Sequence, residues 1–152
     1  MLIRAFRAAD APAVRGLIAE LQRHEHALDP SIARGAGIAA RYFASVRRRM
    51  EAAFVAERGG RVVGFVSMWL DDTYEDLDSR PVRYVYVSDL IVGAADRRRG
   101  IGRALMREAE RWARARRVRQ VRLNVLARNP TARAAYRALG YREVQLSLAR
   151  RV

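Results

Sequence analysis

The segment from residue 85 to residue 115 constrains the fold of this chain more than any other part of the sequence. The run Val85 to Val92 is apolar and rich in β-branched residues, which favours a buried strand. Residues 101–115 carry apolar side chains at helical spacing, namely Ile101, Leu105, Ala109 and Trp112. Only a short turn with two glycines separates the two patterns. The sequence therefore predicts a strand that passes directly into a helix, as in α/β folds.

The turn reads Asp96-Arg97-Arg98-Arg99-Gly100-Ile101-Gly102-Arg103, and its residue types suit an anion. Glycine lets the backbone approach a ligand closely because it has no Cβ atom. The first amide N–H groups of a helix have no partner within the helix, and the helix dipole adds positive charge there. Arginines beside these amides strengthen the attraction. We therefore predict a diphosphate-binding site at the start of the helix.

Two common phosphate-binding motifs do not fit this turn. The Walker loop requires a lysine after its second glycine, and the chain contains no lysine. The dinucleotide-binding fingerprint requires a third glycine where this sequence has Leu105. The pattern that remains is Arg-x-x-Gly-x-Gly.

The rest of the chain alternates strand and helix patterns without a linker or an internal repeat, so we expect one domain over residues 1–152. Strands are predicted at 2–6, 53–57, 62–70, 81–92, 121–125 and 141–148. Helices are predicted after a cap at Asp10, at 38–50, at 101–115 and at 130–139. This order predicts a mixed sheet of about six strands with helices on both faces. The strands that flank the 101–115 helix should run parallel.

A second motif, Asn129-x-x-Ala132-x-x-x-Tyr136-x-x-x-Gly140-Tyr141, spans a helix with an asparagine cap and a terminal glycine. Together with the Arg-x-x-Gly-x-Gly turn, it resembles the GNAT superfamily of N-acetyltransferases, whose segment usually ends in Gly-Phe. The resemblance implies the GNAT acyl-CoA N-acyltransferase fold, with acetyl-CoA as cosubstrate. It also implies direct transfer of the acetyl group to a primary amine, either a small cationic amine or a peptide amine.

In this family the glycine turn binds the CoA diphosphate, and the preceding strand pairs with the pantetheine arm through its main chain. A bulge in that strand frees one amide toward the thioester oxygen. The apolar positions slip by three residues across Ser88-Asp89, from Val85 and Val87 to Leu90 and Val92, which is compatible with such a bulge. The expected cofactor-binding residues are Leu90, Ile91, Val92, Arg97, Arg98, Arg99, Gly100, Ile101, Gly102, Arg103, Asn129 and Tyr136.

The resemblance makes Tyr136 the general acid that donates to the departing CoA thiolate, with a tyrosine of the core as the alternative interpretation. Asp89 is the candidate general base because many relatives carry an acidic residue on this strand. Its alternative role is to brace the loop or to pair with an arginine. The other candidates for the base are Glu75, Asp76, His24 and His26. Asn129 is a helix cap, a CoA neighbour, or both.

Acidic and aromatic residues gather after residue 68 and near the end of the first helix. Together they suit a cationic amine, by charge and by cation–π contact. The predicted substrate-binding residues are Glu25, Trp69, Tyr74 and Glu75, with Asp71, Asp72, Asp76 and Asp78 nearby. A solvated turn whose charges balance neighbouring arginines is the alternative.

Composition narrows the choice of partners. The formal charge of +14 comes entirely from arginine and favours anionic partners such as CoA, nucleic acid or acidic proteins. We expect no nucleic-acid partner, but a basic RNA- or ribosome-associated protein acetyltransferase and a non-catalytic acyl-CoA-binding module stay as alternatives. No cysteine and only two histidines predict no metal site. Without a signal peptide or an apolar run of membrane-spanning length, we expect a cytoplasmic protein.

The C-terminal segment departs from the family pattern. Only twelve residues follow Gly140, which is enough for one strand, whereas the family usually ends with two. One wall of the acceptor site is then open or supplied by a partner subunit. A homodimer is therefore a hypothesis.

Overall fold

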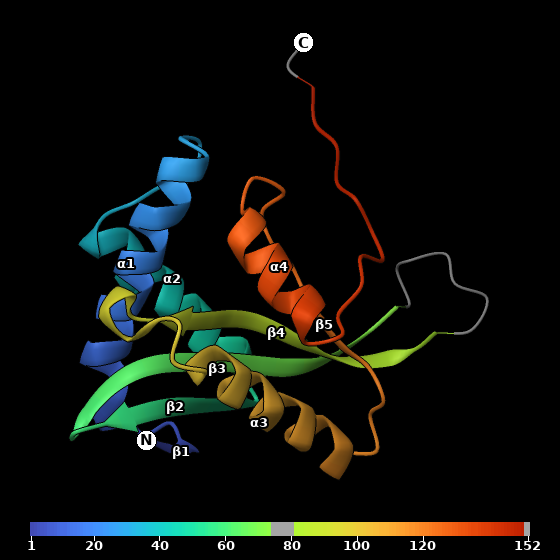
Figure 1. Cartoon of the computed structure of the whole chain (residues 1–152), viewed down its shortest axis with the longest axis horizontal. Coiled ribbons are helices and arrows are strands. Elements are labelled where there is room, and N and C mark those ends of the chain that lie inside the picture. The colour runs from blue at the N-terminus through green and yellow to red at the C-terminus, as the bar shows by residue number, and fades with distance from the viewer. Residues whose placement is uncertain (74–80, 151–152) are drawn as a thin grey trace.

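The computed structural model describes residues 1–73 and 81–150, which build helices around a five-stranded sheet (Figure 1). The strands lie in sequence order: β1 (Leu2–Ala5), β2 (Ala52–Arg58), β3 (Arg61–Asp72), β4 (Arg83–Val92) and β5 (Val121–Leu123). Neighbouring strands are antiparallel except for β4 and β5, which are parallel. The predicted mixed sheet and its parallel pair are confirmed.

Two helices pack on each face of the sheet (Figure 1). On one face, α1 (Ala11–Leu28) and α2 (Ala36–Arg49) bury an apolar cluster that includes Phe43 of α2 and Phe65 of β3. On the other face, α3 (Ile101–Ala115) buries Leu105 and Ala109, and α4 (Pro130–Ala138) packs on the same cluster through Tyr136. Short 3-10 turns, η1 (Ala8–Asp10) and η2 (Ala94–Asp96), precede α1 and α3.

A β-bulge interrupts the pairing of β3 with β4. Ser67 lies opposite Asp89, and the next residue, Met68, lies opposite Val87, so Ser88 has no opposite residue. The extra residue exchanges the two faces of β4. Residues 85 and 87 before the bulge pack on the α3 side with residues 90 and 92 after it, whereas Ile91 packs on the α1 side. The bulge predicted from the slip of apolar positions is confirmed.

Helix α3 lies close to the sheet because glycines remove side chains at two points. A Cβ atom on Gly64 of β3 would lie 3.0 Å from Leu105 Cδ1 and 3.1 Å from the carbonyl oxygen of Ile91. Gly100 occupies the N-cap position of α3 with φ +75°, a left-handed conformation that glycine adopts without strain. The helix therefore begins where the sequence predicts, directly above the end of β4.

The predicted sixth strand is wrong. Residues 141–150 form no helix or strand, and β5 ends at Leu123, before Val125. The alternation of Val144, Leu146 and Leu148 led to the prediction, but alternation shows only which side chains share a face. A strand also needs a neighbour for its main-chain hydrogen bonds, and the described residues supply none here.

Asp10 precedes α1 as expected, but it does not cap that helix. Its carboxylate instead accepts from the Arg7 amide N–H at 2.8 Å and from the guanidinium of Arg4 at 2.7 and 2.9 Å. It therefore ties η1 to β1. Within the described residues, no helix combines the length and the apolar character that crossing a membrane requires.

Candidate functional site

The glycine turn presents a row of backbone N–H groups without protein partners. The first hydrogen bond into α3 runs from the Ala104 amide to the carbonyl of Gly100, at 3.0 Å. Within residues 1–73 and 81–150, no hydrogen bond uses the amides of residues 98–103. Arg98 holds φ +62° and Gly100 holds φ +75°, so two left-handed residues shape the turn. The side chains of Arg98, Arg99 and Arg103 are exposed beside these amides, which gives the turn the character of an anion site.

Arg97 has a different environment from its two neighbours in the turn. Its Nε atom donates to the carbonyl oxygen of Val92 at 3.1 Å, and its guanidinium lies 3.4 Å from Glu20 Oε1. The same Glu20 oxygen accepts from the Ala94 amide at 2.6 Å. Arg97 and Glu20 therefore fix the turn against α1 and the end of β4.

Strands β4 and β5 diverge beside the bulge. β5 pairs only with residues 85–87 of β4, whereas β3 follows β4 from residue 83 to residue 92. The segment from Ser88 to Val92 therefore has a strand on only one side within the described residues. An extended ligand could pair there with the main chain of β4.

Asp89 is buried at the bulge and accepts three hydrogen bonds from hydroxyl groups. Its side chain is 3% exposed. Tyr42 Oη donates to Oδ1 at 2.9 Å, and the hydroxyls of Ser67 and Ser88 donate to Oδ2 at 2.7 and 2.9 Å. Burial raises the pKa of Asp89, and the three hydroxyls oppose that shift. Tyr42 is 39% exposed, so its hydroxyl links the buried carboxylate to the surface.

Tyr42, Ser67 and Ser88 were not predicted as site residues. We expected Tyr42 to lie on the apolar side of the second helix, and its contact with Asp89 joins residues far apart in sequence. The two serines did carry a signal, since each is a polar residue inside an apolar strand pattern. Such a residue needs a hydrogen-bond partner when it is buried, as Ser67 is.

Glu25 and Tyr136 lie in the same electrostatic neighbourhood. Burial raises the pKa of Glu25, and the nearby Asp89 raises it further. Burial also raises the pKa of Tyr136 to about 12, with a smaller contribution from Glu25. Within the described residues, no hydrogen bond engages the Tyr136 hydroxyl, although its ring packs edge to face on Tyr141 at 5.9 Å. Helices α1 and α4 thus bring a carboxylate and a neutral phenol toward the bulged strand.

Asn129 caps α4, because its Oδ1 atom accepts from the Ala132 amide at 3.0 Å. His26 Nδ1 is hydrogen-bonded to the carbonyl oxygen of Ile32 at 2.7 Å, which fixes the loop between α1 and α2. Both residues therefore have structural partners. Neither arrangement places them in acetyl transfer.

The predicted aromatic and acidic substrate residues are only partly described. Trp69 packs on Tyr86 with ring centroids 5.0 Å apart, and the guanidinium of Arg49 lies 4.6 Å from the centroid of its ring. One face of this tryptophan thus already contacts a cation from the same chain. Tyr74, Glu75, Asp76 and Asp78 lie outside the described residues.

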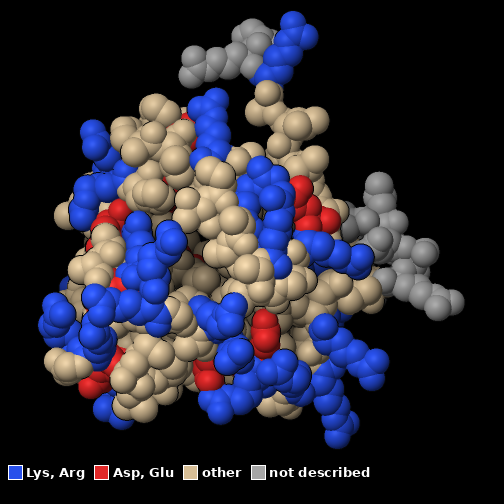
Figure 2. Space-filling model, viewed as in Figure 1, with Lys and Arg blue, Asp and Glu red and all other residues tan. Residues whose placement is uncertain are grey.

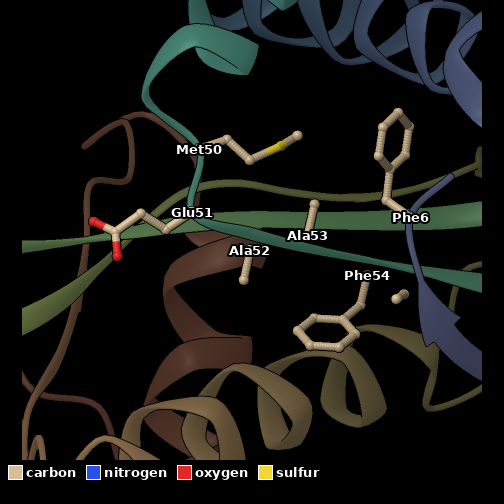
Figure 3. Close-up of a pocket in the computed structure, with 7 residues that line it drawn as sticks. Phe6, Met50, Glu51, Ala52, Ala53 and Phe54 are labelled. Carbon is tan, nitrogen blue, oxygen red and sulfur yellow. The ribbon is translucent and has the colours of Figure 1, made fainter. Parts of the chain in front are cut away.

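A small pocket lies near β1 and β2, at the edge of the sheet opposite to β5 (Figure 3). Its only charged lining residue, Glu51, accepts from the Leu70 amide at 3.1 Å. The other lining residues are apolar: Ala5, Phe6, Met50, Ala52, Ala53 and Phe54. This pocket therefore lacks the groups that acetyl transfer requires.

The model of the acetyltransferase (GNAT) family matches residues 18–141. The chain belongs to the GNAT family. This match covers both motifs singled out above and confirms the predicted fold and enzyme class, an N-acetyltransferase. Comparison with curated proteins finds no match.

Solved structures of GNAT proteins share the whole fold. A tetramutant of the BH1408 protein from Bacillus halodurans is 22% identical with a TM-score of 0.87, covering 100% of each chain. A putative acetyl transferase from Pyrococcus furiosus is 24% identical with a TM-score of 0.76, covering 99% of each. The aminoglycoside N-acetyltransferase AAC(6')-Iy in complex with CoA is 21% identical with a TM-score of 0.72, covering 99% of this chain and 93% of that one.

Proposed function

We propose that this GNAT protein transfers an acetyl group from acetyl-CoA to the primary amine of a small cationic molecule or a peptide. The observation that carries the proposal is the row of unpartnered amides at residues 98–103, which begins α3 just after the bulged strand. The CoA diphosphate accepts from these amides, and Arg98, Arg99 and Arg103 add positive charge. The solved CoA complex of AAC(6')-Iy, a protein of the same fold, supports the choice of cofactor.

The pantetheine arm lies along β4 between Ser88 and Val92, where β5 has diverged. It pairs with the main chain of Leu90 and Ile91, since the carbonyl of Val92 already accepts from Arg97. This placement carries the thioester toward the bulge. The main-chain amide freed there stabilises the negative charge that develops on the thioester oxygen.

Acetyl transfer follows by direct attack. The neutral amine nitrogen forms a bond to the thioester carbon, and the carbon–sulfur bond breaks as the tetrahedral intermediate collapses. The ammonium nitrogen of the acceptor loses two protons in all: one is released to solvent through a base, and the other balances the proton that sulfur gains. Tyr136 donates to the departing sulfur, because its raised pKa keeps the phenol neutral and its hydroxyl has no other described partner.

Asp89 is the proposed base, and Tyr42 is its route to the acceptor. The carboxylate is too deeply buried to touch a substrate directly, but the half-exposed Tyr42 hydroxyl donates to it. A proton passed to the Tyr42 oxygen releases the phenolic proton to Asp89, so Tyr42 never ionises. Glu25, which lies near both Asp89 and Tyr136, holds the cationic acceptor in place.

The alternatives have less support. Figure 2 shows arginines spread over the visible face and not gathered into one patch, which does not favour an RNA- or ribosome-associated enzyme. A non-catalytic acyl-CoA-binding module gives no reason for an unpartnered tyrosine hydroxyl beside Glu25. We place the enzyme in the cytoplasm as a homodimer without a catalytic metal.

The test combines CoA release with cofactor binding. Purified protein and acetyl-CoA are incubated with polyamines, aminoglycosides, amino acids and peptides, and free thiol is measured. We expect turnover with at least one cationic amine; binding of acetyl-CoA without thiol release from any amine would favour the non-catalytic module. Gly100→Trp should weaken acetyl-CoA binding more than 10-fold by calorimetry. Gly60→Trp is the matched control, because Gly60 has φ +71° in the β2–β3 turn, away from the site.

A further inference from the structure

The C-terminal tail, residues 144–150, carries the sequence pattern of a strand but has no strand to pair with. Val144, Leu146 and Leu148 are 64%, 74% and 92% exposed, more than any other large apolar side chain in the described residues. In an extended chain, alternate residues point to the same side. The tail therefore presents an apolar stripe together with unpaired main-chain N–H and C=O groups.

The sheet ends in an edge with the complementary need. β5 is the last strand of the sheet and pairs with β4 on one side only, within residues 1–73 and 81–150. Val125, just beyond β5, is 37% exposed. A free strand edge presents a row of hydrogen-bonding groups that another extended chain can use.

The start of the tail is held on α4, so that the tail does not lie on its own β5. Glu143 pairs with Arg133 at 2.6 Å and with Arg137 at 2.8 Å, and both arginines belong to α4. Tyr141 donates to Glu110 of α3 at 3.2 Å. Figure 1 shows the chain leaving this anchor along α4 and continuing beyond the body of the molecule.

We propose that two copies of this chain exchange their tails, each tail pairing with the β5 edge of the other copy. One two-fold axis satisfies both edges at once, because the contact of tail with β5 occurs twice. Hydrogen bonds along β5 use the main chain of the tail, and Val144, Leu146 and Leu148 become covered by the partner. A second copy is the occupant because it carries the tail and the edge in equal number.

The charge of the chain gives the dimer an unusual salt response. Each copy carries a formal charge of +14, so two copies repel at low ionic strength. Salt screens this repulsion and also strengthens the burial of apolar side chains when the salt is a sulfate. Dimerisation should therefore tighten as salt rises, whereas binding of a nucleic acid would weaken.

Engineered disulfides test the exchange directly, because the chain has no cysteine of its own. Leu146→Cys protein is mixed with a tagged chain that carries Val125→Cys, and the mixture is oxidised. We expect a covalent species that contains one chain of each kind on a non-reducing gel. The matched control carries Leu2→Cys, an exposed apolar position on β1 at the opposite edge of the sheet, and should not cross-link above background.

Two results would overturn the exchange. In the double variant Val125→Cys/Leu146→Cys, a disulfide within a single chain would show that the tail folds back on its own β5. Sedimentation showing a monomer at 50 µM chain and 0.5 M salt would exclude the dimer. We expect instead a dimer for the natural sequence and a monomer for Leu146→Asp/Leu148→Asp. Neither measurement depends on acetyl transfer, so the exchange and the proposed function fail separately.

Discussion

Strand β4 and the C-terminal tail share a sequence pattern but differ in outcome. Both contain apolar residues at alternate positions. In β4 these residues are buried, since β3 pairs along its whole length and helices cover both of its faces. In the tail, the same alternation ends in side chains that are among the most exposed of the chain. Alternation thus predicts which side chains share a face, while a neighbouring strand and a covering helix decide whether that face is buried.

The largest expected effect compares one apolar residue from each region. Ile91 of β4 is 2% exposed, and Leu146 of the tail is 74% exposed. We expect Ile91→Ala to lower the free energy of unfolding by about 2–5 kcal/mol, the usual range for large aliphatic truncations in a core. Leu146→Ala should change it by less than about 0.5 kcal/mol when the chain is dilute enough to be monomeric. Urea unfolding measures both, and equal costs would contradict the distinction.

The next effect concerns α4, which lies between the two regions. Tyr136 faces the site, whereas the hydroxyl of its neighbour Tyr141 donates to Glu110. We expect Tyr136→Phe to lower kcat about 100-fold, within the range for loss of a general acid, with little change in the Kd for acetyl-CoA. Tyr141→Phe is the matched control and should keep kcat within about threefold. Normal turnover by Tyr136→Phe would remove this tyrosine from the mechanism.

A smaller effect separates the buried carboxylate of β4 from an acid that is paired with arginine. Burial raises the pKa of Asp89, so its stabilising contribution is complete below its unfolded pKa, about 4. That contribution is lost as pH rises toward the higher folded pKa. Asp89→Asn does not titrate at this position. The variant should therefore gain stability relative to the natural protein as pH rises from 4 to 8.

The control for this pH dependence has the opposite sign. Hydrogen bonds from Arg4 lower the pKa of Asp10, so its stabilising contribution is present above the unfolded pKa and is lost as pH falls through the folded pKa. Asp10→Asn should therefore lose stability relative to the natural protein as pH rises. Thermal unfolding over the pH range measures both variants. The same direction for the two would contradict the assigned environments.

Local signals predicted much of the fold and part of the site. The start of α3 at Ile101 followed from apolar periodicity and the glycine before it, and the cap at Asn129 followed from its position before a proline. The bulge near Ser88 was visible as a slip in the apolar positions of one strand. Each of these features depends on neighbours within a few residues, so the sequence carries it directly.

Features that join distant segments were not predictable in the same way. Tyr42 and Asp89 meet only because α2 lies over the bulge, and an amphipathic pattern says nothing about which polar group a tyrosine will find. Arg49 over Trp69 is a similar case, since the helix end and the strand approach only in the folded chain. The missing sixth strand adds the complementary error, in which a correct local pattern lacked a partner.

Hydrogen exchange on the glycine turn tests the central claim most directly. The amides of residues 98–103 have no described protein partner, so they should exchange rapidly in the free enzyme. We expect saturating acetyl-CoA to slow exchange in the peptide that contains these residues, and in the β4 peptide before it, while the β2–β3 turn is unchanged. Slowed exchange around the pocket of Phe6 and Phe54, with the glycine turn unaffected, would contradict the proposed cofactor site.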